Sequence, residues 1–176
     1  GLVIFLEYLD DTITDPDEMI RLTHVPFLGP VPILEPKMAG PGSRDLLALQ
    51  EPTSVYAEAY RAVRTNLLFA SPDNPPRIMA VTSPGEQEGK TLTAVNLAIT
   101  MALMGKKVLL VDADMRKPRV QKIFGLENTV GLSNLISGES DVAIALNPTQ
   151  VPTLSVLGSG PIPPNPCCGC RTCGSA

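Results

Sequence analysis

The chain has 176 residues, a formal net charge of −4, an isoelectric point near 5.0 and 44% hydrophobic residues. This length allows one α/β domain with a real core, and the acidic balance argues against a general nucleic-acid binder. The first residue is Gly, and no basic region precedes the apolar residues 1–6, so a signal peptide is unsupported. We therefore expect the chain to begin inside a longer protein.

The first 53 residues contain little regular structure. Residues 1–6 are too few to cross a bilayer, which needs about twenty residues, so they are either the end of a longer spanning helix or a short buried element. An N-cap, a proline and two acidic residues predict a helix from Pro16 to about His24. The three prolines in 25–34 favour an extended segment, and the Pro- and Gly-containing stretch 35–53 is typical of a linker.

A helix is predicted from Ser54 to about Phe69. Its apolar residues recur at helical spacing and would form one buried face: Val55, Ala59, Val63 and Leu67. Three charges beside that face are three residues apart, namely Glu58, Arg61 and Arg64. They can pair within the helix or reach a neighbouring subunit, and spacing alone favours a solvated face with a weak pair.

Residues 77–91 have the pattern of a phosphate-binding loop. The apolar run 77–83 predicts a buried strand, and Gly89-Lys90-Thr91 opens an alanine-rich helix expected to extend to Met104. Backbone N–H groups there would meet phosphate oxygens, Lys90 would reach the terminal phosphates and Thr91 would ligate Mg²⁺. The pattern G-x-x-x-x-G-K-[ST] expects Gly where this chain has Pro84.

The next strand is predicted at 107–112 and ends in two aspartates, Asp112 and Asp114. Apolar strands separated by a helix predict a parallel doubly wound sheet, whose ligands lie beyond the carboxyl ends of the strands. If the chain stays extended, both carboxylates face the phosphates, one holding metal-bound water and one acting as a base. The alternative is an Asp-rich turn at the strand end.

The remaining elements are predicted to be short. We expect helices at 119–124, 131–136 and 140–145 and a strand at 153–157. The proline-rich loop 158–166 would lie over the nucleotide.

Several motifs together resemble the bacterial tyrosine kinases of capsular and exopolysaccharide synthesis that are fused to a chain-length-determinant membrane protein. The resemblance extends to residue 166. The segments that carry it are 6–13, 25–32, the E-x-x-R-x-x-R helix at 58–64, the Walker A loop ending in 88–91, the second acidic motif at 111–118, Gly125-Leu, Gly131-Leu-Ser and 158–166.

This resemblance implies a P-loop NTPase-like α/β fold, with a parallel sheet and helices on both faces, incomplete in this chain. It implies an ATP-dependent tyrosine autokinase that regulates polysaccharide polymerisation and export from the cytoplasmic face of the bacterial inner membrane. ATP and Mg²⁺ are the implied cofactors, and ring assembly through residues 58–64 and the polysaccharide export machinery are the implied partners. The implied site comprises the catalytic residues Lys90, Asp112 and Asp114, the metal ligands Thr91 and Asp112, and the nucleotide-binding residues Gly85, Glu86, Gln87, Glu88, Gly89, Lys90, Thr91 and Leu92.

The expected organisation is a transmembrane remnant at 1–6, a juxtamembrane segment at 7–34, a linker at 35–53, a partial kinase domain at 54–166 and an aberrant tail at 167–176. The family's Walker B strand and tyrosine cluster have no counterpart in this sequence, so we expect the chain to be inactive alone. The four cysteines of the tail have C-x-x-C spacings but lack a separated ligand pair, so we favour a frameshift over a zinc site. Two alternatives stay open, a MinD/ParA-like ATPase and a non-catalytic co-polymerase module.

Overall fold

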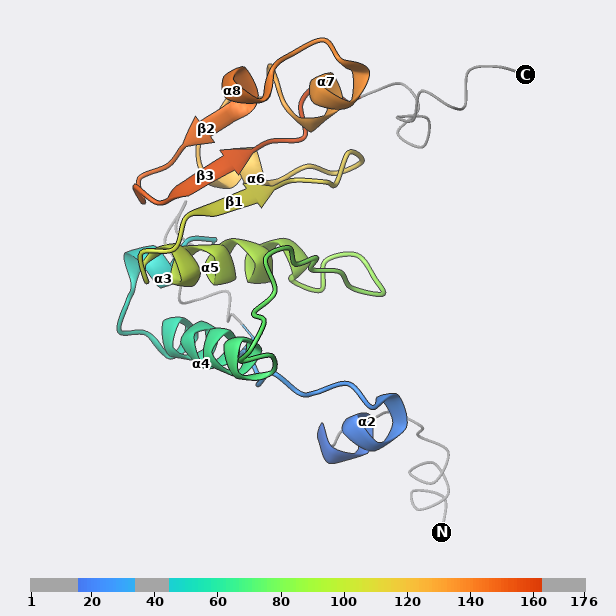
Figure 1. The fold of residues 1–176 in the computed structure, drawn as a ribbon, viewed down its shortest axis with the longest axis vertical. Helices are drawn as coiled ribbons and strands as arrows, with labels where there is room; N and C mark the ends of the chain where they lie inside the picture. Colours follow the sequence, from blue (N-terminus) through green and yellow to red (C-terminus); the bar gives the residue numbers. More distant parts are fainter. Residues whose placement is uncertain (1–15, 34–44, 163–176) are drawn as a thin grey trace, which may run out of the picture.

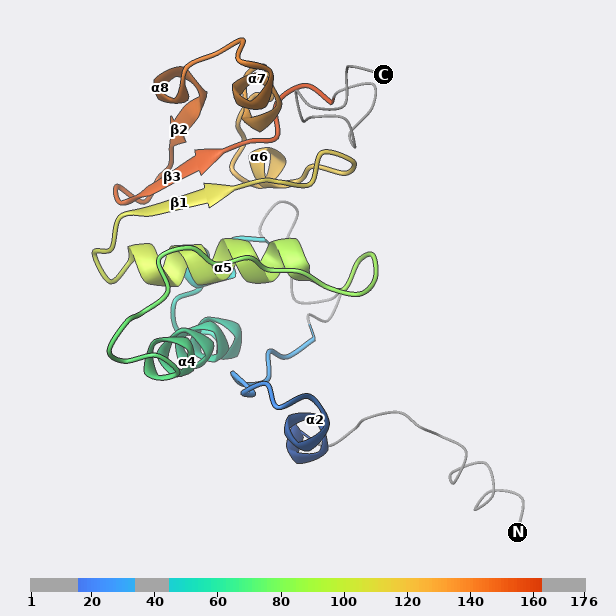
Figure 2. The same cartoon turned by 45° about the vertical axis from the view of Figure 1, so that its right-hand side comes forward.

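The structure is a computed structural model, which describes residues 16–33 and 45–162 (Figure 1). The predicted membrane remnant and the cysteine-rich tail lie outside the described residues. Helix α5 lies between helix α4 and a small sheet, nearest to strand β1, in both ribbon views (Figures 1 and 2). The helices are α2 Pro16–Thr23, α3 Leu47–Gln50, α4 Val55–Phe69, α5 Lys90–Ala102, α6 Val120–Ile123, α7 Leu132–Ser137 and α8 Val142–Ala145, and the strands are β1 Val108–Val111, β2 Leu146–Pro148 and β3 Leu154–Leu157.

The sheet has three strands in the order β1-β3-β2. Strands β1 and β3 are parallel, with Val108 opposite Leu154 and Val111 opposite Leu157. This pairing confirms the two strands predicted at 107–112 and 153–157. Strand β2 was not predicted, and it pairs with β3 in the antiparallel sense. The sheet is therefore mixed rather than purely parallel.

Local signals located the two long helices correctly. Ser54 caps α4 by accepting a hydrogen bond from the N–H of Ala57 at 3.2 Å. The buried face of α4 differs from the predicted one, because Ala57, Tyr60 and Val63 are buried while Val55 is 71% exposed. Val63 is buried and Leu67 packs in the same cluster, so the predicted helix was right and its predicted face was right in part.

Helix α3 is a correction to the predicted linker at 35–53. Leu46, Leu47 and Ala48 are buried, and Ala48 packs with α5 and the sheet in the main core. Asn96 of α5 is fully buried and holds this segment: its side-chain oxygen accepts the N–H of Ala48 at 2.9 Å, and its amide donates to the carbonyl of Asp45 at 3.0 Å. The Pro- and Gly-rich composition of 35–53 predicted a linker and gave no sign of this short helix. The helix is stabilised by burial of its apolar side chains against residues distant in the sequence.

The segment before the phosphate loop is a second correction. Residues 77–83 form no strand in the structure, and Ile78 is 93% exposed. A strand requires hydrogen-bonded neighbours, and within the described residues β1 pairs only with β3. The apolar composition predicted a strand, but the described part of the chain provides no partner for it.

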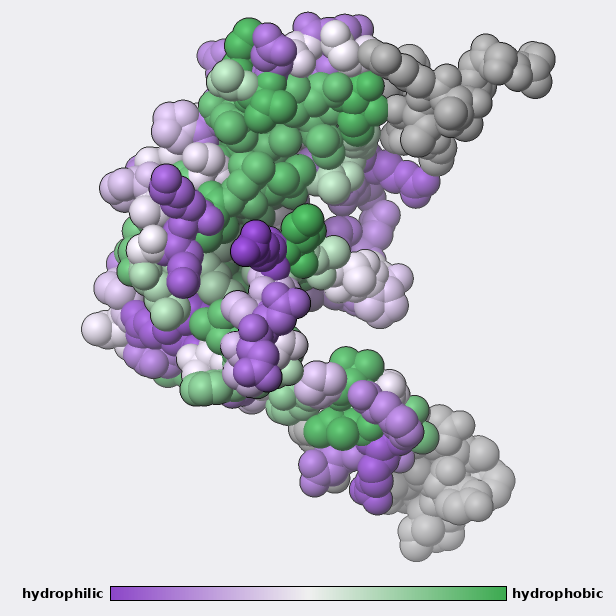
Figure 3. Space-filling model, in the orientation of Figure 1, coloured by the Kyte–Doolittle hydropathy of each residue, from purple (hydrophilic) through white to green (hydrophobic). Residues whose placement is uncertain are grey.

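The sheet leaves apolar side chains uncovered. Leu109 and Val111 of β1 are 50% and 40% exposed, whereas Leu110 between them is buried. Figure 3 shows hydrophobic surface gathered over the end of the molecule that carries the sheet, α7 and α8. Among the described residues, none of the helices has the length and hydrophobicity needed to span a bilayer.

Candidate phosphate-binding site

The loop before α5 has the backbone shape of an anion-binding turn. Gly89 is the N-cap of α5 and has φ of +85°, a left-handed conformation that favours glycine. Lys90 and Thr91 are the first two residues of the helix, where unpaired N–H groups and the helix dipole favour a phosphate. Gln87 also has a positive φ, of 63°. Two residues of the loop therefore have a left-handed backbone conformation.

The loop is closed by its own acidic side chain. The N–H of Gly85 donates to the Glu88 carboxylate at 3.0 Å, and the hydroxyl of Ser83 donates to the carbonyl of Gly85 at 2.8 Å. A Cβ at Gly85 would lie 2.7 Å from a Glu88 oxygen, so a side chain at position 85 would displace that carboxylate. The backbone group predicted to meet phosphate is therefore paired with Glu88 in this structure.

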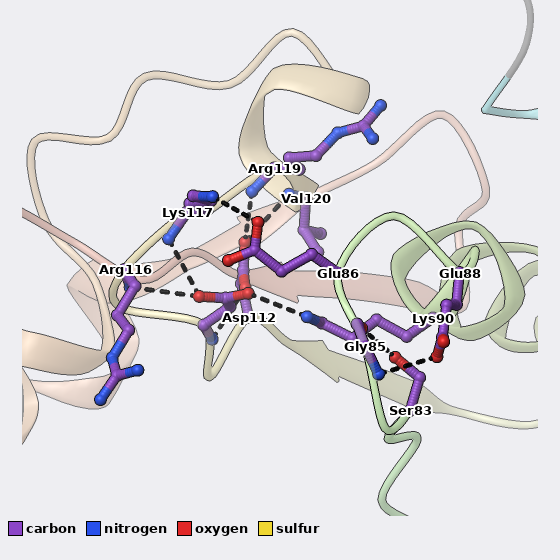
Figure 4. Close-up of polar contacts among 11 residues, drawn as sticks. Ser83, Gly85, Glu86, Glu88, Lys90, Asp112, Arg116, Lys117, Arg119 and Val120 are labelled. Carbon is purple, nitrogen blue, oxygen red and sulfur yellow. Dashed lines mark hydrogen bonds and ion pairs between the residues drawn. The ribbon is translucent and has the colours of Figure 1, made fainter.

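Asp112 directly follows β1 and is 5% exposed. One of its oxygens accepts the N–H of Asp114 at 3.1 Å. The other accepts the N–H groups of Arg119 and Val120 at 3.0 and 2.9 Å. These three bonds connect the end of the strand to the start of α6 and fix the path of the loop between them, the acidic loop 112–119 (Figure 4).

Asp114 has a different environment from Asp112, because the chain turns after the strand instead of staying extended. Its carboxylate accepts the N–H groups of Arg116 and Lys117 at 3.1 and 2.9 Å. It also lies 3.4 Å from the amine of Lys90. The hydrogen bond from the Lys117 backbone, followed by that from Arg116 and the pairing with Lys90, lowers the pKa of Asp114 against the opposing effect of burial.

Lys117 is a site residue that the sequence analysis missed. Its amine lies 2.6 Å from the carboxylate of Glu86 in the phosphate loop. The Lys117 ion pair is the main cause of a lowered pKa at Glu86. A basic residue three positions after Asp114 was the available signal.

The carboxyl end of β3 lies beside the end of β1, and Gly158–Gly160 continues from it. The side chain of Asn128 donates to the carbonyl of Gly160 at 2.7 Å and accepts its N–H at 2.9 Å. A Cβ at Gly131 would lie 2.1 Å from the Gly160 nitrogen, so the start of α7 approaches this turn too closely for a side chain. The loop 158–166 was predicted to lie over the nucleotide, and its first residues are thus fixed to Asn128 and α7. Residues 163–166 lie outside the described residues.

The three charges predicted for oligomerisation make contacts within the chain. Arg61 pairs with Glu58 and donates to the carbonyl of Pro52. Arg64 donates to the carbonyl of Thr100 at 2.8 Å. Thr100 lies in the last turn of α5, where a cation interacts favourably with the helix dipole. Arg64 therefore joins α4 to α5, while the Glu58 side chain is 66% exposed.

Tyr60 on α4 is also directed at α5. It is 1% exposed and is therefore a packing residue. Burial raises the pKa of the Tyr60 hydroxyl, and its pairing with Thr93 in the first helical turns of α5 partly offsets this.

The donor set fits a magnesium–nucleotide complex better than a metal held by protein alone. Within the described part of the chain, no three His, Cys, Asp or Glu side chains are grouped to hold a metal ion. Mg²⁺ in nucleotide sites takes one or two protein oxygens together with phosphate and water. Thr91 and Asp114 offer such oxygens next to Lys90, whereas both Asp112 oxygens already accept backbone N–H groups.

The glycine-led helix, the lysine at its first position and the acidic loop at the ends of parallel strands define a P-loop nucleotide-binding protein of the α/β class. In agreement, residues 79–144 match the family model described as the CobQ/CobB/MinD/ParA nucleotide binding domain. The fold is P-loop NTPase-like, with an incomplete sheet in the described residues.

Similar proteins indicate a narrower family than this nucleotide-binding domain. The chain is 49% identical over 123 residues to the tyrosine-protein kinase YwqD of Bacillus subtilis, which covers 70% of this chain and 52% of that protein. It is 42% identical over 110 residues to the tyrosine-protein kinase CpsD of Streptococcus agalactiae, covering 62% of this chain and 47% of that protein. The chain thus spans about half the length of these relatives and belongs to the family of bacterial tyrosine-protein kinases.

Solved structures agree with this assignment. The crystal structure of the chimerical protein CapA2B2 has a TM-score of 0.75 and 36% identity, over 86% of this chain and 63% of that one. The kinase domain of the Escherichia coli tyrosine kinase ETK has a TM-score of 0.77 and 27% identity, over 88% of this chain and 63% of that one.

The lowered pKa of Asp114 predicts a pH-dependent contribution to stability. Because the folded-state pKa lies below the unfolded value of about 3.9, the contribution is present above that value and is lost as the pH falls through the folded-state pKa. We expect Asp114→Asn to lower the urea midpoint at neutral pH and to match the wild type in strong acid. Urea unfolding across this range checks it, with the exposed Asp73→Asn as control. A difference that persists unchanged in strong acid would contradict the prediction.

Proposed function

We propose that this chain is the nucleotide-binding part of an ATP-dependent protein-tyrosine kinase. The observation that carries the proposal is the Lys90 amine 3.4 Å from Asp114 at the start of α5. This arrangement joins a phosphate-binding cation to an acid, in a chain related to proteins named tyrosine-protein kinases.

The roles follow from position. Lys90 would neutralise charge that develops on the transferred phosphoryl group. The loop residues Gly85–Leu92 would bind the phosphates, with Gly89 providing the left-handed turn. Asp114, once released from Lys90, would orient or deprotonate the acceptor hydroxyl. Magnesium, when bound, neutralises charge on the phosphates, and Thr91 is its proposed ligand.

Asp112 has a separate part in this proposal. A direct bond from Asp112 to the metal would compete with the three backbone N–H groups that it accepts. We therefore assign Asp112 the task of holding the acidic loop in place. Its predicted role as a metal ligand is the competing assignment.

The resemblance to the tyrosine kinases of capsular and exopolysaccharide synthesis suggests the setting. We propose that the intact protein acts at the cytoplasmic face of the inner membrane, where it regulates capsule or exopolysaccharide polymerisation and export. We further propose assembly into a ring through α4. Of its charged triplet, Glu58 is best exposed for contact with a neighbouring subunit, while Arg61 and Arg64 contact their own chain.

The match to the CobQ/CobB/MinD/ParA model favours a second candidate, an ATPase without protein-kinase activity. Incubation of the purified intact protein, rather than of this chain alone, with MgATP separates the two candidates, with phosphotyrosine detected by antibody and phosphate release measured in parallel. Phosphotyrosine supports the kinase, and phosphate release without it supports the ATPase. Absence of MgATP binding would overturn both candidates.

A further inference from the structure

Two ion pairs with opposite polarity connect the phosphate loop to the acidic loop. Lys90 of the phosphate loop pairs with Asp114 of the acidic loop at 3.4 Å. In return, Lys117 of the acidic loop pairs with Glu86 of the phosphate loop at 2.6 Å. Each loop therefore contributes one acid and one base. Figure 4 labels Lys117, Glu86 and Lys90 of these two contacts.

Lys117 has a backbone that is fixed by a hydrogen bond and a side chain that is largely exposed to solvent. Its N–H donates to Asp114 at 2.9 Å, which fixes its position within the turn. Its side chain is 69% exposed, and its amine reaches the residue immediately after Gly85. The side chain of an exposed lysine on a fixed backbone can turn so that its amine pairs with a new anion, without rearrangement of the loop.

The charges near the loop suggest which anion that is. A magnesium–nucleoside triphosphate carries a net charge of about −2, and charge-assisted hydrogen bonds to phosphate are stronger than those between neutral groups. Glu86 and Asp114 neutralise Lys117 and Lys90 in this structure. Exposed ion pairs contribute little to stability, so a phosphate can displace the Glu86 carboxylate at small cost.

Resting on the proposed nucleotide-binding function, we propose that Lys117 is a second phosphate-binding cation and that Glu86 is its counter-ion when no nucleotide is bound. Binding of the triphosphate then exchanges the Glu86 carboxylate for a phosphate oxygen. Both lysines thereby contact the nucleotide, one from each loop.

The two substitutions in this pair have opposite expected effects on affinity. Lys117→Gln removes a cation that contacts phosphate, so the Kd for MgATP is expected to rise roughly tenfold. Glu86→Gln removes the competing carboxylate, so the Kd is expected to fall, by roughly twofold or more. If the pair only held the loop in shape, both substitutions would weaken binding.

Isothermal titration of the wild type and both variants with MgATP tests the proposal, with exposed Lys106→Gln as the matched control. Circular dichroism verifies that each variant is folded. Weaker binding by Lys117→Gln with tighter binding by Glu86→Gln supports the proposal. Unchanged affinity in Lys117→Gln, or weaker binding by both variants, overturns it. An intact wild-type protein that binds MgATP but forms no phosphotyrosine would refute the kinase and leave the Lys117 result valid.

Discussion

Lys90→Met is expected to raise the Kd for MgATP by about 30-fold to 1,000-fold, because it removes a charged contact worth roughly 2–4 kcal/mol. Lys90 is the first residue of α5 and follows the left-handed Gly89, so its amine extends from the helix N-terminus toward Asp114. Phosphotyrosine formation by the intact protein should be lost in parallel. Isothermal titration and antibody detection after incubation with MgATP measure the two effects.

Stability provides the internal control for this substitution. The side chains of Lys90 and Asp114 are 37% and 29% exposed, and such a pair contributes at most about 1 kcal/mol. Lys90→Met should therefore remain folded while it loses the nucleotide. Lys107→Met, at an exposed position before β1, should retain full affinity. A folded Lys90→Met that binds MgATP normally would show that the loop is not the phosphate site.

Elements determined by local signals were predictable from the sequence. The Ser54 cap and the helical spacing after it predicted α4, and the Gly-Lys-Thr turn predicted the start of α5. The buried face of α4 was predicted only in part, because Tyr60 and Ala57 pack against a neighbour that periodicity does not identify. Helix α3 was missed because its burial depends on Asn96, about fifty residues further along the chain.

The strand predicted at 77–83 was wrong for a related reason. Its composition is suitable for a strand, yet Ile78 has no described neighbour against which to pack. Strand formation is a property of a pair of segments rather than of one segment. Conversely, β2 contains Pro148, which argues against a strand by composition, but β2 pairs with β3.

The proximity of Lys90 and Asp114 was predictable, but the geometry of the site was predictable only in part. The motif located Lys90 and the two aspartates in a common region. The shared direction of Asp112 and Asp114 was predicted only for an extended chain, and that condition is not met. The chain turns after β1, where the Asp112 carboxylate accepts three backbone N–H groups. Lys117 was missed because its contact joins two loops that are 31 residues apart in sequence.

Asp112→Ala is expected to lower the free energy of unfolding by about 3–5 kcal/mol, a large fraction of the total stability of a small domain. The substitution leaves three backbone N–H groups without their acceptor at the start of α6. Asp112→Asn should have an intermediate effect, because one of the two oxygens becomes an NH₂ group facing N–H donors. Urea unfolding followed by circular dichroism measures both.

The same variants separate the two roles considered for Asp112. If Asp112 mainly holds the acidic loop, loss of stability and loss of MgATP affinity should occur together, because displacement of the loop also moves Asp114 and Lys117. Exposed Glu127→Ala should change stability by less than about 0.5 kcal/mol. If Asp112→Ala instead has the urea midpoint of the wild type and loses only the magnesium-dependent part of its affinity for ATP, Asp112 is a metal ligand. The acidic loop would then be held mainly by the bonds that Asp114 accepts from Arg116 and Lys117.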